Sequence, residues 1–359
     1  MSPISAMTMK RRIFLSSKVP FILFDLPSAY PIGSFRSRIL AFIVDCSILY
    51  VVGRIVGAAF YDTLSMLGLW GRACGFCIAL VYFMTMESRI GGGQTLGKRL
   101  FRLRVVNAQG GLITWNRAAI RYIICAIPFF LIEPRYTMSY TTWGVSALIT
   151  FIDLGVGGAS LYLLIFNSRT RQGLYDVAMK TYVVESRALG PIQTKPIWGL
   201  HWSVICSYLI LIALAELSKG ITTDWQQKSA YISQFLQEEQ LIAKLGGVQT
   251  GKVRIFMPIP YDGSALGNLV PKKRNAIVTV QLDRSTANRE IFADQVAAIV
   301  LQTDTRAKKE DSIQIRIGRS YDLVISSGND YQYFTHTPAE WHQRVLAASA
   351  GGPGLTDPK

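Results

Sequence analysis

Long apolar stretches separated by basic loops dominate the first 220 residues of the chain. A helix needs about 20 mostly apolar residues to cross the hydrocarbon core of a bilayer. Four segments meet this requirement while carrying few charges, namely residues 39–59, 67–86, 145–166 and 197–217. Trp198 and Trp202 lie at the start of the last segment, where side chains of this type anchor a helix at the membrane interface. The pattern therefore predicts four membrane-spanning helices.

A fifth segment, residues 118–132, is a weaker candidate for a span. Arg121 lies near its start and leaves only 11 apolar residues, one of which is Pro128. The segment spans the bilayer if it is short or tilted, or it enters and leaves on the same side.

The second half of the chain has a different pattern, typical of a soluble domain. Apolar residues alternate with polar ones at a period of two in residues 253–257, 276–282, 313–317 and 321–326, which predicts strands. Residues 224–245 and 290–302 have near-helical spacing, and Thr337-Pro338-Ala339-Glu340 is a capping box that begins a last helix. Residues 258–274 are rich in proline and glycine and predict a long loop, which is either functional or a connector. We expect an antiparallel sheet packed on helices, an α+β domain.

The charge of the chain supports a membrane protein. Half of the residues are apolar, only 17% are charged, and the net charge is +15. The basic residues are concentrated in three loops of the apolar half, since residues 10–38, 88–121 and 167–196 carry 6, 7 and 5 Lys or Arg. The alternate loops carry only Arg72 and Arg135. Because basic loops stay in the cytoplasm, this asymmetry predicts five spans, a cytoplasmic N-terminus and a C-terminal domain outside an inner (plasma) membrane. A basic surface for nucleic acid is not indicated.

The predicted architecture is therefore an α-helical transmembrane bundle of about five spans joined to a C-terminal α+β soluble domain. The expected segments are residues 1–34 as an interfacial lead-in, 35–186 as the membrane domain, 187–218 as a linker with the last span, 219–349 as the extracytoplasmic domain, and 350–359 as a tail.

Three charged residues lie where the bilayer would make an isolated charge costly. Arg38 and Asp45 are seven residues apart and share one helix face, so the arginine is expected to reach toward the aspartate. Asp153 precedes Gly155, Gly157 and Gly158, which permit close helix packing. In one interpretation, the two carboxylates line a polar path or bind an ion. In the other, which is favoured, they tie helices together through hydrogen bonds.

Three motifs resemble the RDD family of bacterial membrane proteins, which is named for an arginine and two aspartates. The first, FRSRILAFIVD, matches at Arg38 and Asp45, and the last, RTRQGLYDVAMKTYVV, places Asp176 on the second aspartate. The loop between them matches the family's glycine-rich segment at Gly93, Thr95, Gly97 and Lys98. The resemblance covers residues 35–184, with Tyr175 where histidine is expected. It implies a membrane module, for which transport of an unidentified ligand is the usual suggestion.

Other motifs carry little chemistry. The segment from Gly92 to Lys98 spells a phosphate-binding loop, but Arg99 stands where Ser or Thr must hold magnesium. Cys74 and Cys77 lie inside an apolar span, and the three histidines are scattered, so no metal site and no cofactor is predicted. No catalytic residues are evident. We expect a non-enzymatic protein of the lipid bilayer that binds a protein partner or small ligand outside, or alternatively a scaffold or assembly factor whose buried charges are structural. The sequence does not give the oligomeric state.

Overall fold

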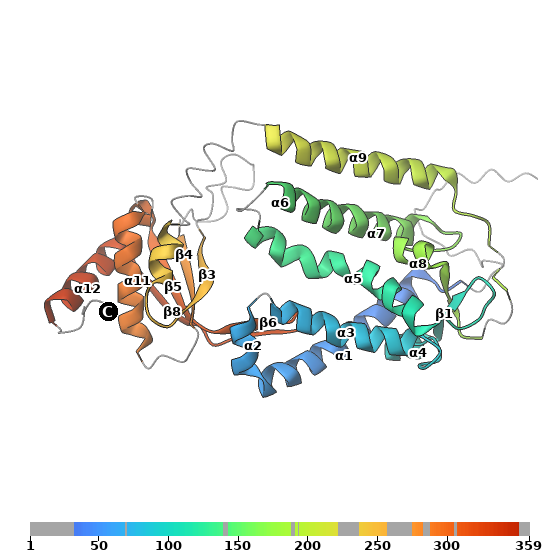
Figure 1. Cartoon of the computed structure of the whole chain (residues 1–359), viewed down its shortest axis with the longest axis horizontal. Coiled ribbons are helices and arrows are strands. Elements are labelled where there is room, and N and C mark those ends of the chain that lie inside the picture. The colour runs from blue at the N-terminus through green and yellow to red at the C-terminus, as the bar shows by residue number, and fades with distance from the viewer. Residues whose placement is uncertain are drawn as a thin grey trace, which may run out of the picture.

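The computed structural model has a helical bundle and a smaller α+β domain at one end of it (Figure 1). It describes residues 32–68, 70–138, 143–187, 191–192, 194–221, 237–256, 275–282, 288–304 and 307–351. The expected lead-in before residue 32, most of the helix expected over 224–245, the loop expected over 258–274 and the end of the tail lie outside these residues.

The helices of the bundle follow the apolar segments of the sequence. They are α1 (Phe35–Ala59), the short α2 (Tyr61–Leu67), α3 (Trp70–Glu87), α5 (Trp115–Met138), α6 (Trp143–Thr150), which continues through the π-helical turn η1 (Phe151–Val156) into α7 (Gly157–Phe166), and α9 (Gly199–Ile221). Three described helical segments are long and apolar enough to cross a membrane: α1, residues 147–166 and α9. The bent pair α2 and α3 makes a fourth if it counts as one span. The described residues thus give three or four candidate spans where five were expected.

Helix α5 accounts for the difference. It is one continuous helix of 24 residues, so the segment expected over 118–132 does not turn back within the bundle. At 1.5 Å per residue it is about 36 Å long, enough to cross the hydrocarbon core. It is not among the candidate spans, and it carries several charges, including Arg117, Arg121, Glu133 and Arg135.

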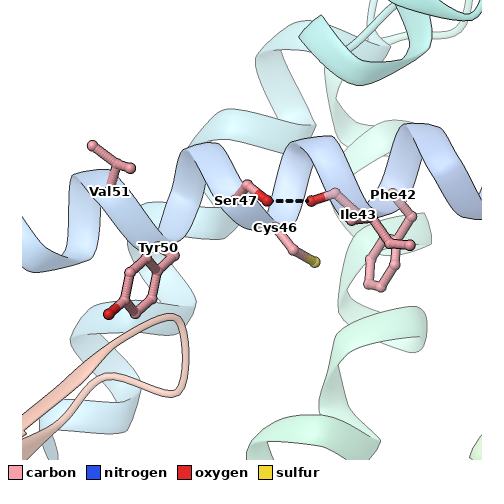
Figure 2. Close-up of a pocket in the computed structure, with 6 residues that line it drawn as sticks. All are labelled: Phe42, Ile43, Cys46, Ser47, Tyr50 and Val51. Atoms are coloured by element: carbon pink, nitrogen blue, oxygen red, sulfur yellow. Dashed lines mark hydrogen bonds between the residues drawn. The ribbon is translucent and has the colours of Figure 1, made fainter.

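Helix α1 of the bundle buries charged and small residues and exposes large apolar ones, the reverse of a helix in a water-soluble protein. The buried face of α1 consists of charged and small residues together with Leu49, and includes Arg38, Asp45, Gly53 and Gly57. Its exposed face carries large apolar side chains such as Phe42, Ile43 and Val51, and Figure 2 shows a shallow hollow among them. Because soluble proteins rarely expose a continuous row of large apolar side chains, we interpret this face as the surface that contacts lipid.

Short elements close the end of the bundle opposite the α+β domain (Figure 1). They are the helices α4 (Leu96–Leu100) and α8 (Leu174–Met179) and the antiparallel strands β1 (Leu103–Asn107) and β2 (Thr181–Glu185). Val105 and Val183 are buried in the core beneath this sheet, together with Ala41 of α1. This sheet was not expected from the sequence.

The C-terminal domain has a four-stranded sheet with the order β3–β4–β5–β8, covered by two helices. The strands are β3 (Val248–Phe256), β4 (Asn275–Leu282), β5 (Ser312–Gly318) and β8 (Gln332–His336), and the helices are α11 (Arg289–Thr303) and α12 (Pro338–Gly351). Its core includes Val278, Ile315 and Trp341. The capping box is confirmed, since Thr337 N donates to Glu340 Oε2 and Glu340 N donates to Thr337 Oγ1.

Two expectations for this domain were wrong. The sheet is mixed rather than antiparallel, because α11 returns the chain so that β5 runs parallel to β4. The strand expected over 321–326 does not join the sheet. Residues 320–329 instead form a separate hairpin of β6 (Ser320–Asp322) and β7 (Ser327–Asn329), and β8, which was not predicted, is the fourth strand.

Candidate functional site

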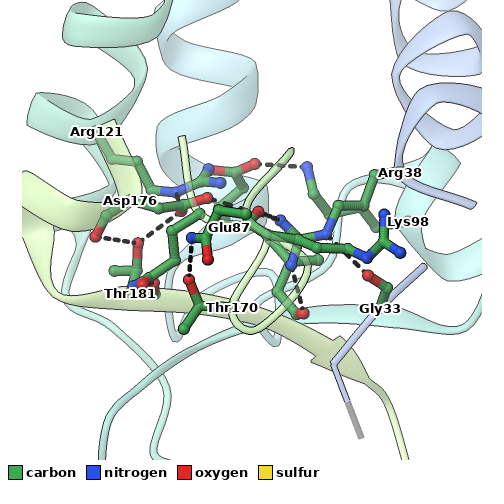
Figure 3. Close-up of polar contacts among 12 residues, drawn as sticks. Gly33, Arg38, Glu87, Lys98, Arg121, Thr170, Asp176 and Thr181 are labelled. Carbon is green, nitrogen blue, oxygen red and sulfur yellow. Dashed lines mark hydrogen bonds and ion pairs between the residues drawn. The ribbon is translucent and has the colours of Figure 1, made fainter. Parts of the chain in front are cut away.

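The charged residues at the closed end of the bundle form one buried network, drawn in Figure 3. Arg121 of α5 lies at its centre. Its Nε donates to Asp176 Oδ1 of α8 at 2.8 Å, and its Nη1 pairs with Glu87 Oε2 of α3. Lys98 Nζ of α4 approaches the other oxygen of Glu87 at 2.7 Å. Asp176 and Glu87 are almost completely buried.

Arg38 of α1 completes the network from the other side. Its Nη1 lies 3.9 Å from Asp176 Oδ2, and its guanidinium also donates to the carbonyls of Gly33, Arg171 and Val183. Backbone carbonyls therefore supply most of the hydrogen bonds of this buried cation. The expected approach of Arg38 to Asp45 is wrong, because Asp176 and these carbonyls hold the guanidinium at the end of the bundle.

Asp45 lies in a separate cradle made by the glycine-rich segment. Its Oδ1 accepts hydrogen bonds from Tyr82 Oη at 2.7 Å and from Gly97 N at 2.8 Å, and its Oδ2 accepts one from Thr95 Oγ1 at 2.6 Å. Thr95 also caps α4 by accepting from Lys98 N. Three hydrogen bonds to one carboxylate explain how Asp45 can be fully buried at the depth of a membrane helix.

Two glycines make this cradle possible. Gly93 has a φ of +74°, a left-handed conformation that allows the turn before α4. A Cβ on Gly97 would overlap the carbonyl of Ala41 and lie 2.9 Å from Asp45 Oδ1. The segment that spells a phosphate-binding loop thus binds a carboxylate of the same chain.

Asp153 is not part of either cluster. It lies in the π-helical turn η1 and is half-buried. The glycines that follow it pack closely on neighbouring helices, as predicted: a Cβ on Gly155 would lie 3.0 Å from Leu209 of α9, and one on Gly157 would lie 3.3 Å from Pro128 of α5.

Sequence reasoning missed Glu87 as a member of the network. It is the last residue of an apolar span, where it resembles an ordinary interfacial charge. Arg121 was noted only as an interruption of a span. Tyr175, the departure from the family pattern, lies against the network, with its ring centroid 5.0 Å from Arg121 Cζ. A cation over an aromatic face is attracted by the ring quadrupole, so tyrosine contributes to holding Arg121.

A second polar seam joins the C-terminal domain to the opposite end of the bundle. The hairpin of β6 and β7 enters between α1 and α3, and its tip residue Leu323 is completely buried there (Figure 1). Arg72 Nη1 of α3 lies 2.6 Å from Asp322 Oδ2. Its other nitrogens donate to the carbonyls of Phe129 and Phe130 in α5, and the latter is free because Pro134 has no N–H to bond it.

Four glycines form the slot that receives the hairpin. A Cβ on Gly53 would lie 2.6 Å from Ser326 Oγ, and one on Gly57 would overlap the ring of Tyr321. On α3, a Cβ on Gly71 would lie 2.8 Å from Asp322 O, and one on Gly75 would overlap the carbonyl of Leu323. Each helix thus carries a G-x-x-x-G pair, the motif that brings membrane helices into close contact. Here the two pairs admit a β-hairpin between the helices, and they were the available signal for this contact.

Charged residues fix the base of the hairpin. Arg319 Nη1 lies 2.5 Å from Asp62 Oδ1 of α2, and Tyr61 Oη donates to Arg319 O at 2.9 Å. Asp330 accepts from Arg319 N and from Arg289 Nη2. Burial alone would raise the pKa of the Asp330 carboxyl, but these hydrogen bonds and the two guanidinium groups outweigh it and lower the pKa below its usual value.

The network and the cradle use the positions that suggested a known family from the sequence. Residues 32–180 match the model of the RDD family. This stretch is similar to an RDD domain. The match ends within the closed end of the bundle, so α9 and the α+β domain lie outside it. No curated protein and no solved structure matches the chain.

The arginine and the second aspartate of the RDD signature, Arg38 and Asp176, meet in one ion-pair network, while Asp45 is held apart by the glycine-rich segment. Within the described residues, no group of three or more His, Cys, Asp or Glu is arranged to hold a metal ion. With its apolar helices and its match to the RDD family, the chain is a multi-pass membrane protein.

Proposed function

We propose that this chain is a non-enzymatic protein of the inner (plasma) membrane whose RDD domain holds an extracytoplasmic α+β domain against the outer surface, where that domain binds a protein partner or ligand. The observation that carries the proposal is the hairpin of residues 320–329, which joins the C-terminal domain to the end of the bundle opposite the basic loops. A soluble domain that was merely tethered would need no such contact.

The proposed topology has five spans. The N-terminal end of α1, the loop of α4 and β1, and the α8–β2 segment lie at one end of the bundle, and they contain most of its basic residues (Figure 1). Basic loops remain in the cytoplasm. Helix α5 is long enough to cross, and its inclusion makes the number of spans odd, which puts the C-terminal domain on the side opposite the N-terminus.

The ion-pair network is, in this proposal, structural. Arg38, Glu87, Lys98, Arg121 and Asp176 come from five different elements, and each contacts at least one partner of opposite charge. The network has three cations and two anions, and Asp45 in the neighbouring cradle adds a third anion, so the network and the cradle together carry no net charge. A neutral, hydrogen-bonded cluster stabilises the closed end without requiring a transported ion.

Cysteine accessibility tests the topology. In a variant without the five native cysteines, a single cysteine is placed either at Gln343 of α12 or at Gln109 of the turn after β1, both of which are exposed. A membrane-impermeant maleimide applied to intact spheroplasts should label the first and spare the second, and lysis should make both reactive. Labelling of Gln109→Cys in intact spheroplasts, or protection of Gln343→Cys, would contradict the proposal.

Cross-linking tests the hairpin contact directly. Asp62→Cys and Arg319→Cys replace two side chains whose tips approach within 2.5 Å, so a short bismaleimide should join them within one chain. The pair Asp62→Cys and Gln343→Cys serves as control, since α12 lies on the far side of the domain (Figure 1). Equal yields from the two pairs would show that the domain is not held by the hairpin.

Transport through the bundle is the second candidate, and the cradle of Asp45 favours it. A buried carboxylate in contact with the hydroxyls of Tyr82 and Thr95 is an arrangement suited to passing protons or binding a cation. Proteoliposomes that contain a pH dye should then respond to a Na⁺ or K⁺ gradient. Asp45→Asn and Asp153→Asn should abolish the response at unchanged protein level if the carboxylates transport, and should lower the protein level if they are structural.

A further inference from the structure

A cavity of about 440 Å³ opens at the basic end of the bundle, away from the ion-pair network. It lies between α8, β2 and the segment that leads into α9. Its polar and aromatic lining includes Thr170, Gln172, Lys180, Tyr182, Lys195 and Trp202. Its volume is within the range of small-molecule sites, about 300–1,000 Å³.

The cavity has the electrostatics of an anion site. Lys180 and Lys195 come from different segments and both line it, and none of the residues that line it is acidic. Thr170, which also lines the cavity, accepts a hydrogen bond from Asn167 at its Oγ1, and a hydroxyl that accepts one bond keeps a proton to donate. Two cations and a hydroxyl are donors suited to a phosphate group.

The RDD signature positions one of these lysines. Lys180 is the left-handed residue that ends α8, with φ at +50°, and its N–H bonds the carbonyls of Asp176 and Val177. The next residue, Thr181, donates to Asp176 Oδ1 and accepts from Gln172 Nε2. Non-glycine residues rarely adopt this conformation, so the backbone of Lys180 is held in it at some conformational cost. The hydrogen bonds around Asp176 thus set the position of this lysine.

Two tryptophans at the cavity indicate the level of the lipid headgroups. Trp202 lines the cavity and Trp198 is exposed one turn earlier, at the start of α9, as in the aromatic belts of membrane helices. Beyond Trp202, α9 exposes apolar side chains such as Ile210 and Leu211 along its length. A molecule with a phosphate in the cavity could therefore lay hydrocarbon chains against α9.

From this geometry we infer that the cavity binds the headgroup phosphate of an anionic phospholipid, with the acyl chains on the exposed face of α9. The site is distinct from the proposed contact of the α+β domain and requires only that α9 lies in the membrane. Basic pockets beside membrane helices on the cytoplasmic side are suited to such headgroups.

The test measures thermal stability of the full chain purified in a neutral detergent, titrated with dioleoyl phosphatidylglycerol, dioleoyl phosphatidylcholine or inorganic phosphate. We expect a saturable rise in melting temperature with phosphatidylglycerol only. An equal rise with phosphatidylcholine would show that the anionic group is not recognised. A rise with inorganic phosphate at the same concentration would identify free phosphate as the ligand and overturn the lipid assignment.

Variants separate a built site from general attraction. Lys180→Gln with Lys195→Gln should weaken the apparent affinity for phosphatidylglycerol about 25-fold, at about fivefold per lysine near an anionic surface. Arg89→Gln with Arg187→Gln removes the same charge from the same end of the bundle outside the cavity and should leave the affinity within about twofold. Equal losses in the two double variants would refute the site. If the double variant of Lys180 and Lys195 does not accumulate, Lys195→Gln is tested alone, since Lys195 lies outside the ion-pair network. Its affinity for phosphatidylglycerol must still fall about fivefold.

Discussion

Replacing Arg121 by methionine removes the centre of the ion-pair network and keeps an unbranched side chain in place of the aliphatic part of the arginine. Arg121 is 6% exposed and contacts Asp176 and Glu87 at once. The variant leaves two buried carboxylates with fewer partners and gives the network and the Asp45 cradle together a net negative charge. Lys98 remains beside Glu87, and Arg38 remains 3.9 Å from Asp176, so each anion keeps one cation.

The expected cost follows from these contacts. Removing one partner of a buried ion pair costs about 3–5 kcal/mol, because the other charge is left uncompensated. Since each carboxylate keeps a second cation, we expect the total to lie in this range rather than at twice its value. For a domain of 150–250 residues, 1 kcal/mol lowers the melting temperature by about 2–4 °C. The variant should therefore melt about 6–20 °C below the unaltered protein.

The assay measures the melting temperature of detergent-solubilised protein. Size-exclusion chromatography after heating to a series of temperatures gives the fraction that remains folded. Arg117→Met is the matched control, with the same substitution one turn earlier on α5 at a half-buried position. Adding Asp176→Asn to Arg121→Met restores the charge balance, so the double variant should lose less than the sum of the two single losses. Arg121→Met melting within about 1 °C of Arg117→Met, or strictly additive losses, would refute a coupled network.

Three further outcomes are expected. Gly97→Ala should lower the melting temperature because its Cβ meets the Ala41 carbonyl and the Asp45 cradle, whereas Gly199→Ala, in open space, should not. Leu323→Asp should lower the yield of the cross-link between α2 and the hairpin by placing a charge in a fully buried position, while Leu346→Asp on the exposed face of α12 should leave it unchanged; equal yields would contradict a seated hairpin. Because the pKa of the Asp330 carboxyl is lowered in the folded protein, its contribution to stability is present above about pH 3.9, its unfolded value, and is lost as the pH falls through the folded value. The melting temperature should therefore fall more steeply on acidification for the unaltered protein than for Asp330→Asn. Equal slopes would show that this carboxyl does not contribute to the pH dependence of stability.

Local sequence patterns predicted most of the secondary structure. The apolar segments that predicted spans are helical within the described residues, and the helices α11 and α12 lie close to their expected positions. The RDD signature was also recognisable from the sequence, and the family match over residues 32–180 agrees with it. These features depend on residues close together in the chain, so the spacing of apolar residues and the capping motifs are enough to predict them.

Contacts between distant segments were harder to predict. The sequence placed Arg38 beside Asp45 because the two share a helix face, but the partner of Arg38 lies 138 positions away, where α8 returns to the bundle. Residues 321–326 alternate like a strand of the sheet, yet their apolar side chains fill a slot between α1 and α3. An alternating pattern shows that one face is buried, but it does not show what buries it.

The sequence by itself determined that this chain is a membrane protein with a C-terminal α+β domain, because the length of an apolar helix and the period of a strand are properties of local composition. Only the tertiary structure decided which charges neutralise one another and that a hairpin locks the two parts together. Both depend on small residues, such as Gly97 and Gly75, that allow separate segments to approach within contact distance. That approach depends on how the whole chain packs, which the spacing of residues along the chain does not encode.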